Sequence, residues 1–215
     1  MQRAIPLFVI ILSFILAIYF YPQMPPLMAS HWGLNGLADG YSTKQFALFL
    51  IPAALTILYP FFLLLPSSGP YKKNFHEFSD YYDVFVSLVF FFLFYLYVLT
   101  LIWNLNIYFN MLQFLSPAFS IVFYYAGLLS SKTKRNWFVG IRTPWAYKSD
   151  IVWQKTQTFG GNMFKISSVI CLFSLILPKL SAVLIIVPII FSAIAVNVYS
   201  YSEAQKHQKV THKGQ

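Results

Sequence analysis

The chain has 215 residues, of which 58% are hydrophobic, 20% aromatic and 10% charged. Soluble proteins average about 25% charged residues, so this composition excludes an ordinary soluble domain and indicates an integral membrane protein. The net charge of +9 would suggest nucleic acid as a partner for a soluble protein, but in a membrane protein anionic lipid already meets the cationic loops. We therefore predict contact with membrane lipids and no direct binding of nucleic acid.

Six apolar runs are each close to the ~20 residues with which a helix crosses a hydrocarbon core of about 30 Å. The first run is longer than the apolar region of a secretory signal peptide, about 7–15 residues, and is expected to remain as a span. The fifth run contains Lys165, whose long side chain can reach the headgroups from a helix end. The sequence thus predicts an all-α integral membrane protein, a bundle of six transmembrane helices. In chain order the runs cover residues 4–21, 46–65, 84–103, 111–129, 159–177 and 181–199.

Lysine and arginine are distributed unevenly between the two ends of these spans. If both termini are cytoplasmic, only Lys44 and Lys179 of the 15 lysines and arginines lie on the outer side. Cationic residues in short loops are retained on the cytoplasmic side of a membrane. The charge distribution therefore predicts that both termini are cytoplasmic.

The polar segments between the runs divide the chain into four regions. Only one outer segment is long enough to hold a ligand site, and one inner loop is much longer than the others. The predicted regions are an N-terminal two-span unit at 1–65 with its outer loop at 22–44, a connecting loop and third span at 66–110, a C-terminal module at 111–202 with a cytoplasmic loop at 130–161, and a polar cytoplasmic tail at 203–215.

Residues suited to metal binding or catalysis are sparse. Cys171 is the single cysteine, so the sequence supports no disulfide and no cysteine-based metal site. His31 and Asp39 are eight residues apart on a Gly-rich turn, where hydrogen bonds that shape the loop are a better interpretation than a shared metal. The chain lacks H-E-x-x-H, G-x-S-x-G and paired intramembrane aspartates. We predict no metal, no cofactor and no enzymatic activity.

A transporter is the alternative to consider for a small protein with several spans. Ion-coupled pumps usually bury acidic or basic groups at mid-membrane, whereas Lys165 is the only charged residue in the six apolar runs. A small uncoupled transporter or flippase for a peptide or a lipid stays open as the alternative function.

Residues 136–161 are the densest polar and tryptophan-rich segment of this apolar chain. Gly140 suits an unusual backbone angle, Pro144 restricts Thr143 to extended geometry, and the planar guanidinium of Arg142 suits phosphate or carboxylate. These properties predict a recognition segment. An alternative is that Arg142 binds a lipid phosphate while the tryptophans anchor the loop in the interface.

A short amphipathic helix is predicted directly after this motif. Ser149 or Asp150 can serve as its N-cap, and polar side chains are interleaved with apolar ones over residues 151–159. Such a helix is expected to lie along the membrane surface.

Two patterns in the chain resemble motifs of known families. From Asn136 the chain reads N-x-x-x-G-I-R-T-P-W and then V-W-x-x-T, which resembles the SdpI family of bacterial immunity proteins. From His31 to Lys44 it reads H-W-x-x-N-G-x-x-D-G-Y-x-x-K, which resembles the small domain of unknown function that commonly precedes the SdpI module. Gln157 stands where the family pattern often has a histidine, so no role of a titratable imidazole is expected there.

The resemblance implies a multi-pass protein of a bacterial-type plasma membrane that gives resistance to a secreted, membrane-damaging toxic peptide. It also implies a second role, in which the protein senses the peptide and sequesters a cytosolic autorepressor, a small helix-turn-helix protein. On this basis the partner-binding residues of the cytoplasmic loop are Asn136, Gly140, Arg142, Thr143, Pro144, Trp145, Trp153 and Thr156. The toxin-facing residues of the outer loop are His31, Trp32, Asn35, Gly36, Asp39, Gly40, Tyr41 and Lys44.

Overall fold

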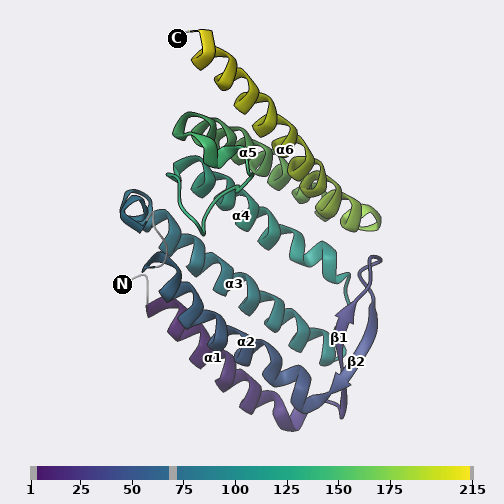
Figure 1. Cartoon of the computed structure of the whole chain (residues 1–215). Coiled ribbons are helices and arrows are strands. Elements are labelled where there is room, and N and C mark those ends of the chain that lie inside the picture. The colour runs from purple at the N-terminus through teal and green to yellow at the C-terminus, as the bar shows by residue number, and fades with distance from the viewer. Residues whose placement is uncertain (1–3, 68–71, 214–215) are drawn as a thin grey trace.

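The computed structural model describes residues 4–67 and 72–213, which form six long helices, one β-hairpin and short 3-10 turns (Figure 1). All six helices are long and apolar enough to cross a membrane, so the predicted six-helix bundle is confirmed and the chain is a multi-pass membrane protein. The helices are α1 (Ala4–Phe20), α2 (Lys44–Leu64), α3 (Ser79–Asn104), α4 (Met111–Lys132), α5 (Asp150–Leu172) and α6 (Ser181–Lys213), and the strands are β1 (Leu27–Trp32) and β2 (Ala38–Thr43).

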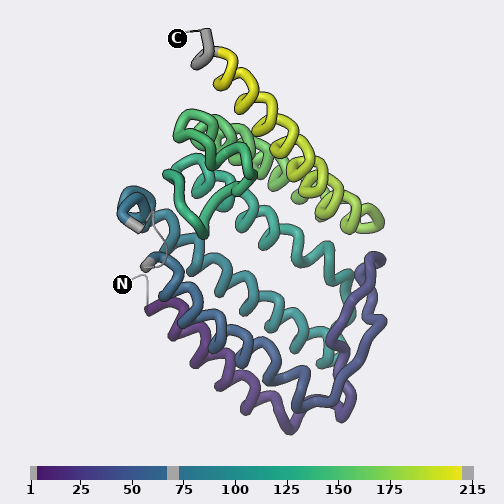
Figure 2. Tube along the Cα trace, viewed as in Figure 1, coloured from purple at the N-terminus to yellow at the C-terminus, as the bar shows by residue number. Residues whose placement is uncertain are grey.

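The helices form two groups of three that lie side by side (Figure 1). In the first group, α1, α2 and α3 pack around a core that includes Val9, Leu55 and Phe90. In the second group, α4 packs extensively on α5, and α5 on α6. α3 and α4 join the groups. Figure 2 shows the hairpin at one end of the bundle and both described chain ends near the other, as an even number of spans requires.

Small residues set the close approach of α4 and α5. A Cβ atom on Gly127 would meet the carbonyl oxygen of Gly161, and a Cβ atom on Gly161 would meet that of Gly127. Farther along α5, the Ser167 hydroxyl lies 3.0 Å from that of Ser192 on α6. Lipid tails are as apolar as leucine, so helices in a membrane associate through such close packing and hydrogen bonds.

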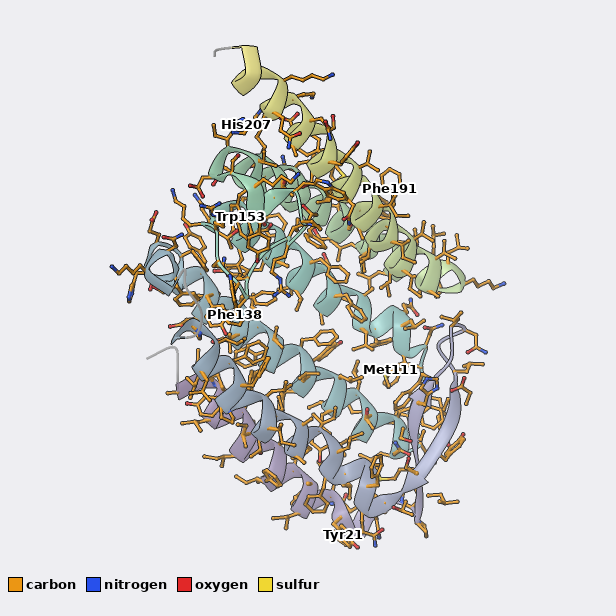
Figure 3. All side chains as sticks on the ribbon, in the orientation of Figure 1. Tyr21, Met111, Phe138, Trp153, Phe191 and His207 are labelled. Atoms are coloured by element: carbon orange, nitrogen blue, oxygen red, sulfur yellow. The ribbon has the colours of Figure 1, made fainter. Side chains whose placement is uncertain are left out.

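The inner loop between α4 and α5 contacts both groups of helices. Val139 is buried in the core of the first group, and Phe138 packs against it (Figure 3). On its other side the loop contacts α5 and α6, where Gly160 leaves room for the side chain of Ile141. The loop therefore connects the two halves of the bundle at this end.

The fifth helix differs from the prediction of a separate surface helix. α5 is continuous from Asp150, so the amphipathic residues 151–159 are the first turns of the fifth span. Ser149 caps the helix, because its hydroxyl accepts a hydrogen bond from the Val152 N–H at 3.1 Å. The interleaved polar residues have partners within the protein, which removes the reason to place them at a membrane surface.

The sixth helix is longer than its apolar run. α6 continues to Lys213, so the part of the predicted polar tail at 203–213 is helical. This polar part contains neither glycine nor proline, so nothing in it stops the helix. Residues 1–3, 68–71 and 214–215, which fall within the predicted regions, lie outside the described part of the chain.

Candidate functional site

A β-hairpin forms the main structure at the outer end predicted from the charges. β1 and β2 pair antiparallel, and register shifts occur beside Ala29, His31 and Trp32. The turn between them has Gly36 at φ 75°, where the preceding Asn35 accepts a hydrogen bond from the Leu37 N–H at 3.0 Å. An Asn-Gly pair is the strongest short-range signal for a hairpin turn. The hairpin was nevertheless not among the elements predicted from the sequence.

Asn104 at the end of α3 fastens the hairpin to the bundle. Its side-chain carbonyl accepts from the Ala29 N–H at 2.8 Å, and its amide nitrogen donates to the carbonyls of Ala29 at 3.0 Å and Thr100 at 2.9 Å. The Asn104 side-chain amide thus hydrogen-bonds both the N–H and the carbonyl of Ala29 on β1. The hairpin turn is held as well, because the Asn110 side chain donates to the Asn35 carbonyl at 2.9 Å.

Replacing Asn104 by leucine is expected to destabilise the protein by about 1–2 kcal/mol, because water at the membrane interface can compensate part of the lost hydrogen bonds. The Ala29 amide should exchange its hydrogen much faster in the variant, while the turn held by Asn110 stays protected. Hydrogen exchange measured by mass spectrometry on the protein in detergent checks this. Unchanged exchange at Ala29 would contradict the assigned role of Asn104.

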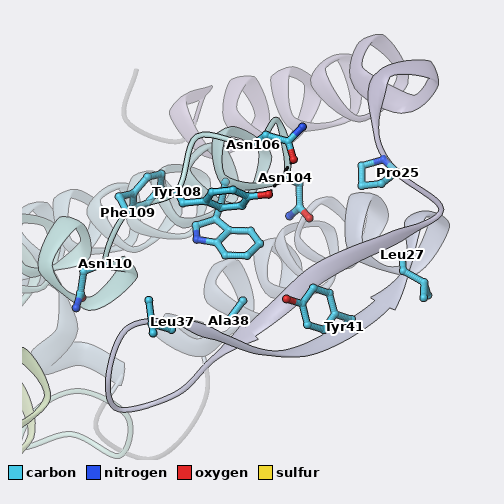
Figure 4. Close-up of a pocket in the computed structure, with 11 residues that line it drawn as sticks. Pro25, Leu27, Leu37, Ala38, Tyr41, Asn104, Asn106, Tyr108, Phe109 and Asn110 are labelled. Carbon is cyan, nitrogen blue, oxygen red and sulfur yellow. Dashed lines mark hydrogen bonds between the residues drawn. The ribbon is translucent and has the colours of Figure 1, made fainter.

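A cavity of about 670 Å³ lies between the hairpin and the connection from α3 to α4 (Figure 4). Its lining combines aromatic rings, aliphatic side chains and three asparagine amides, and none of its 11 residues is charged. The aromatic and amide residues of this outer pocket are Tyr41, Trp103, Tyr108, Phe109, Asn104, Asn106 and Asn110.

The outer-loop residues predicted from the resemblance do not form one cluster. Tyr41 lines the outer pocket, and the Trp32 ring packs edge-on against Trp103 with centroids 6.0 Å apart. His31 and Asp39 form an exposed pair, 2.5 Å between Nδ1 and Oδ1, which agrees with the loop-shaping interpretation. Asn35 and Gly36 join the turn to α4, Gly40 pairs with His31 across the hairpin, and the Lys44 ammonium lies 4.5 Å from the Tyr21 ring centroid.

At the other end of the bundle, Asn136 shapes the start of the inner loop. Its side-chain carbonyl accepts from the N–H groups of Phe138 and Val139, and its amide donates to the carbonyls of Lys134 and Val139. The Asn136 side chain is buried and uses both its donor and its acceptor on the backbone. Its side chain therefore has a structural role in the described conformation.

Gln157 on α5 holds the middle of the inner loop. It accepts from the Ile141 N–H at 2.8 Å, donates to the Ile141 carbonyl at 2.7 Å and accepts from the Ser130 hydroxyl at 2.9 Å. Gly140, at φ 98°, precedes this contact, and a Cβ there would lie 2.7 Å from the Gln157 carbonyl oxygen. The glycine is thus required both by its backbone angle and by the close approach of Gln157.

Three hydroxyls join the inner loop to α5 and α6. The Thr143 hydroxyl lies 2.5 Å from the Ser200 hydroxyl and accepts from the Ala146 N–H, while Thr156 donates to Ser200 at 3.1 Å. Thr143, Thr156 and Ser200 are all buried. Ser200 has no motif signal in the sequence, and its contact with Thr143 spans 57 positions.

The two tryptophans of the predicted partner site differ in position. Trp153 is 1% exposed, and its indole donates to the Thr133 carbonyl at 3.1 Å (Figure 3). Trp145 is half-buried and packs edge-on against Tyr201, with centroids 5.3 Å apart. Of the eight predicted residues, Asn136, Thr143, Trp153 and Thr156 are therefore buried, and Arg142 and Pro144 have exposed side chains.

Arg142 and its neighbours present charge at this inner surface. Arg142 donates to the Trp137 carbonyl and is otherwise exposed. Ion pairs lie at the same end of the bundle. They join Arg135 and Asp150 at 3.1 Å, Lys134 and Glu77 at 3.5 Å, and Glu203 with both Lys155 and Lys206 at 2.7 Å. Among the side chains that the structure describes, residues 4–66 and 73–209, no group of three His, Cys, Asp or Glu is arranged to hold a metal ion.

Comparisons with known proteins agree with both sequence patterns. Residues 132–202 match the model of the SdpI/YfhL protein family, and residues 8–56 match a domain of unknown function, DUF1648. Over 206 residues the chain is 22% identical to the immunity protein SdpI of Bacillus subtilis (strain 168), which covers 95% of this chain and 97% of that protein. The chain is thus similar to the SdpI family in its C-terminal half. No solved structure matches it. The SdpI match contains the whole inner loop from Lys132 and α6 as far as Ser202, and the DUF1648 match contains the hairpin.

The match also places the chain in the cell membrane as a multi-pass protein, as the sequence predicted. The boundary between the two matched regions falls on α3 and α4, since neither match covers residues 57–131. α3 and α4 are the helices that join the two groups. The family match and the helix grouping thus divide the chain in similar places.

Proposed function

We propose that this protein is a membrane immunity protein, which gives resistance to a secreted toxic peptide that damages the membrane. The observation that carries the proposal is its relation to an immunity protein along almost the full length of both chains. A protein related only through its transmembrane helices would not share the outer hairpin region and the inner loop region as well.

The proposed orientation puts the hairpin outside and the inner loop in the cytoplasm. The inner loop, the start of α5 and the end of α6 carry Arg135, Arg142, Lys155 and Lys206, whereas the hairpin end carries few cations. Cys171 is buried, so a cysteine introduced at Lys148, which is exposed, would be the accessible thiol. A thiol reagent that cannot cross lipid should label that position only after the cells are opened. Labelling in intact cells would show that the orientation is the reverse of the proposed one.

Expression of the protein in sensitive cells is expected to raise survival during exposure to the toxic peptide by at least tenfold. Survival counts with and without expression test this, with an inserted but unrelated multi-pass protein as control. Equal killing would contradict the immunity function. Movement of a labelled peptide across vesicles that contain the protein would instead favour the flippase alternative.

For the sensing role, we propose that exposed side chains of the inner loop bind a cytosolic repressor. Arg142 is the strongest candidate, because its guanidinium is exposed and makes one hydrogen bond, to the Trp137 carbonyl. Trp145 lies close by on the same loop. A ligand shifts a conformational equilibrium only through a difference in affinity, and the inner loop contacts both halves of the bundle, so it is placed to respond to a change in their packing.

Arg142→Ala is expected to leave both protection and thermal stability unchanged, while the repressor is no longer recruited to membranes. Co-sedimentation of the repressor with membranes from cells exposed to the peptide measures recruitment. Lys148→Ala is the matched control, since Lys148 is an exposed cation on the same loop. Equal recruitment by the wild type and Arg142→Ala would remove Arg142 from the proposed surface.

A further inference from the structure

The outer pocket described above has a lining without any charge. None of its 11 residues is acidic, basic or histidine, although His31, Asp39 and Lys44 all lie on or beside the same hairpin. A charged group that entered the pocket would lose water without gaining a counter-charge. The pocket therefore selects against charged ligand groups.

Three asparagines and two tyrosines supply the polar part of the lining (Figure 4). A side-chain amide presents a donor and an acceptor, as a peptide bond does. Asn104 already bonds Ala29 and Thr100, and Asn110 bonds Asn35 and Gln113, so Asn106 and the tyrosine hydroxyls are the polar groups left for a ligand. A lipid phosphate is instead usually recognised by arginine, lysine or several N–H groups pointing at one position, and no cationic side chain lines this pocket. The lining fits a neutral peptide better than a lipid headgroup.

Large apolar side chains at the rim are exposed. Leu27 is 62% exposed, Leu37 58%, Tyr41 59% and Tyr108 65%. All four line the outer pocket, at the end of the bundle rather than along the helices that face lipid tails. A cluster of exposed apolar side chains around a pocket is typical of a binding surface.

Two indole groups beside the pocket lack acceptors. The N–H groups of Trp103, which lines the pocket, and of Trp32, which packs against Trp103, are buried and have no hydrogen-bond partner among the described residues. An indole N–H is only a donor, so the missing partner is an acceptor such as a main-chain carbonyl. Both N–H groups are shielded in the described conformation, so a ligand carbonyl reaches them only after a local rearrangement.

We infer that the outer pocket binds an uncharged, apolar segment of a peptide, with the charged parts of that peptide left outside. The inference rests on the proposed immunity function for the biological source of the peptide, and names the part of the outer face that holds it. The proposed peptide contact therefore differs from the one predicted from the sequence, because His31 and Asp39 form their exposed pair outside the pocket.

The test uses the full chain in phosphatidylcholine nanodiscs and two fluorescein-labelled peptides of ten residues with blocked ends. One peptide contains only leucine, phenylalanine, glycine and serine, and the other has two central lysines. Fluorescence anisotropy, corrected for empty nanodiscs, should show binding of the neutral peptide at least tenfold tighter than that of the cationic one. Leu37→Arg, which puts a charge into the lining, should weaken binding of the neutral peptide at least tenfold.

Leu34→Arg is the matched control, because Leu34 is 73% exposed at the hairpin turn and does not line the pocket. It should change the affinity less than twofold. Equal binding by wild type and Leu37→Arg, or binding no tighter than to empty nanodiscs, would overturn the inference. Nanodiscs with brominated acyl chains test a lipid occupant: a quenched emission component that Trp103→Phe removes would also overturn it.

Survival assays separate this inference from the immunity function. If the wild type and Leu37→Arg protect sensitive cells equally, the pocket assignment fails and immunity stands. If the wild type gives no protection but the binding pattern holds in nanodiscs, the immunity function fails and the pocket stands as a peptide site.

Discussion

Replacing Trp153 by alanine is expected to lower the free energy of unfolding by about 3–5 kcal/mol, the usual cost of removing a large aromatic side chain from a packed core. Trp153 is 1% exposed, packs against the Tyr147 ring at 5.4 Å between centroids and donates to the Thr133 carbonyl. Its loss leaves a cavity and an unpaired carbonyl between α5 and the inner loop. Thermal unfolding in detergent, followed by near-UV circular dichroism, measures the change.

Trp137→Ala is the matched control for this variant, because Trp137 lies on the same loop and is 51% exposed. Its expected cost is below about 1 kcal/mol, as for most exposed positions. If both variants were equally stable, Trp153 would not belong to the core. The stabilities of the two variants also determine how a signalling defect is interpreted. If Trp153→Ala fails to recruit a repressor, the loss of stability explains the failure without a direct contact between Trp153 and the repressor.

The six spans were predictable because the requirement behind them is local. Backbone groups in hydrocarbon must bond within their own segment, so a run of about 20 apolar residues such as 84–103 is close to a helix prediction by itself. The ends of helices were less accurate. The residues that extend α5 to Asp150 are amphipathic and those that extend α6 to Lys213 are mostly polar, so neither extension belongs to an apolar run.

The hairpin was missed although its turn has a strong local signal at Asn35 and Gly36. Burial alternates regularly along β2 but not along β1, where register shifts near Ala29 and His31 interrupt the pairing. The strand is further stabilised by Asn104, which is 75 residues away. No pattern in the sequence connects those two positions.

The motif at residues 136–156 was found, but its physical meaning needed the structure. The same residue types that suit recognition also build a loop, and here Asn136, Thr143 and Thr156 direct their polar groups to other buried groups. Exposure separates Arg142 from them. The assignment of the partner-binding and toxin-facing residues remains a prediction that the experiments above address.

At each end of the bundle, a side-chain amide on a helix holds a loop or hairpin through the backbone of one residue. Asn104 bonds both the N–H and the carbonyl of Ala29 in the hairpin, and Gln157 does the same for Ile141 in the inner loop. Each amide sits on a helix and substitutes for a neighbouring strand. A change in helix packing would therefore be passed to each loop through these side chains, which is the coupling that a sensing role requires.

Replacing Gln157 by leucine is expected to cost about 2–4 kcal/mol, since the N–H and carbonyl of half-buried Ile141 lose their hydrogen bonds and each unsatisfied group costs about 1–3 kcal/mol. The Ser130 hydroxyl keeps the Gln157 main-chain carbonyl at 3.3 Å as an acceptor. Leucine is similar in size, so the effect reports the Ile141 and Ser130 contacts rather than a cavity. The Ile141 amide should lose protection from hydrogen exchange together with the drop in thermal stability.

Two further substitutions sharpen this result. Gln154→Leu, on the exposed side of the same helix, should cost less than about 1 kcal/mol. Gln157→His should be intermediate, because a neutral imidazole cannot place a donor and an acceptor side by side as an amide does. If Gln157→Leu is as stable as Gln154→Leu, the inner loop is held instead by the hydroxyls of Thr143, Thr156 and Ser200. The helix that transmits a change to the loop would then be α6, which carries Ser200, as much as α5.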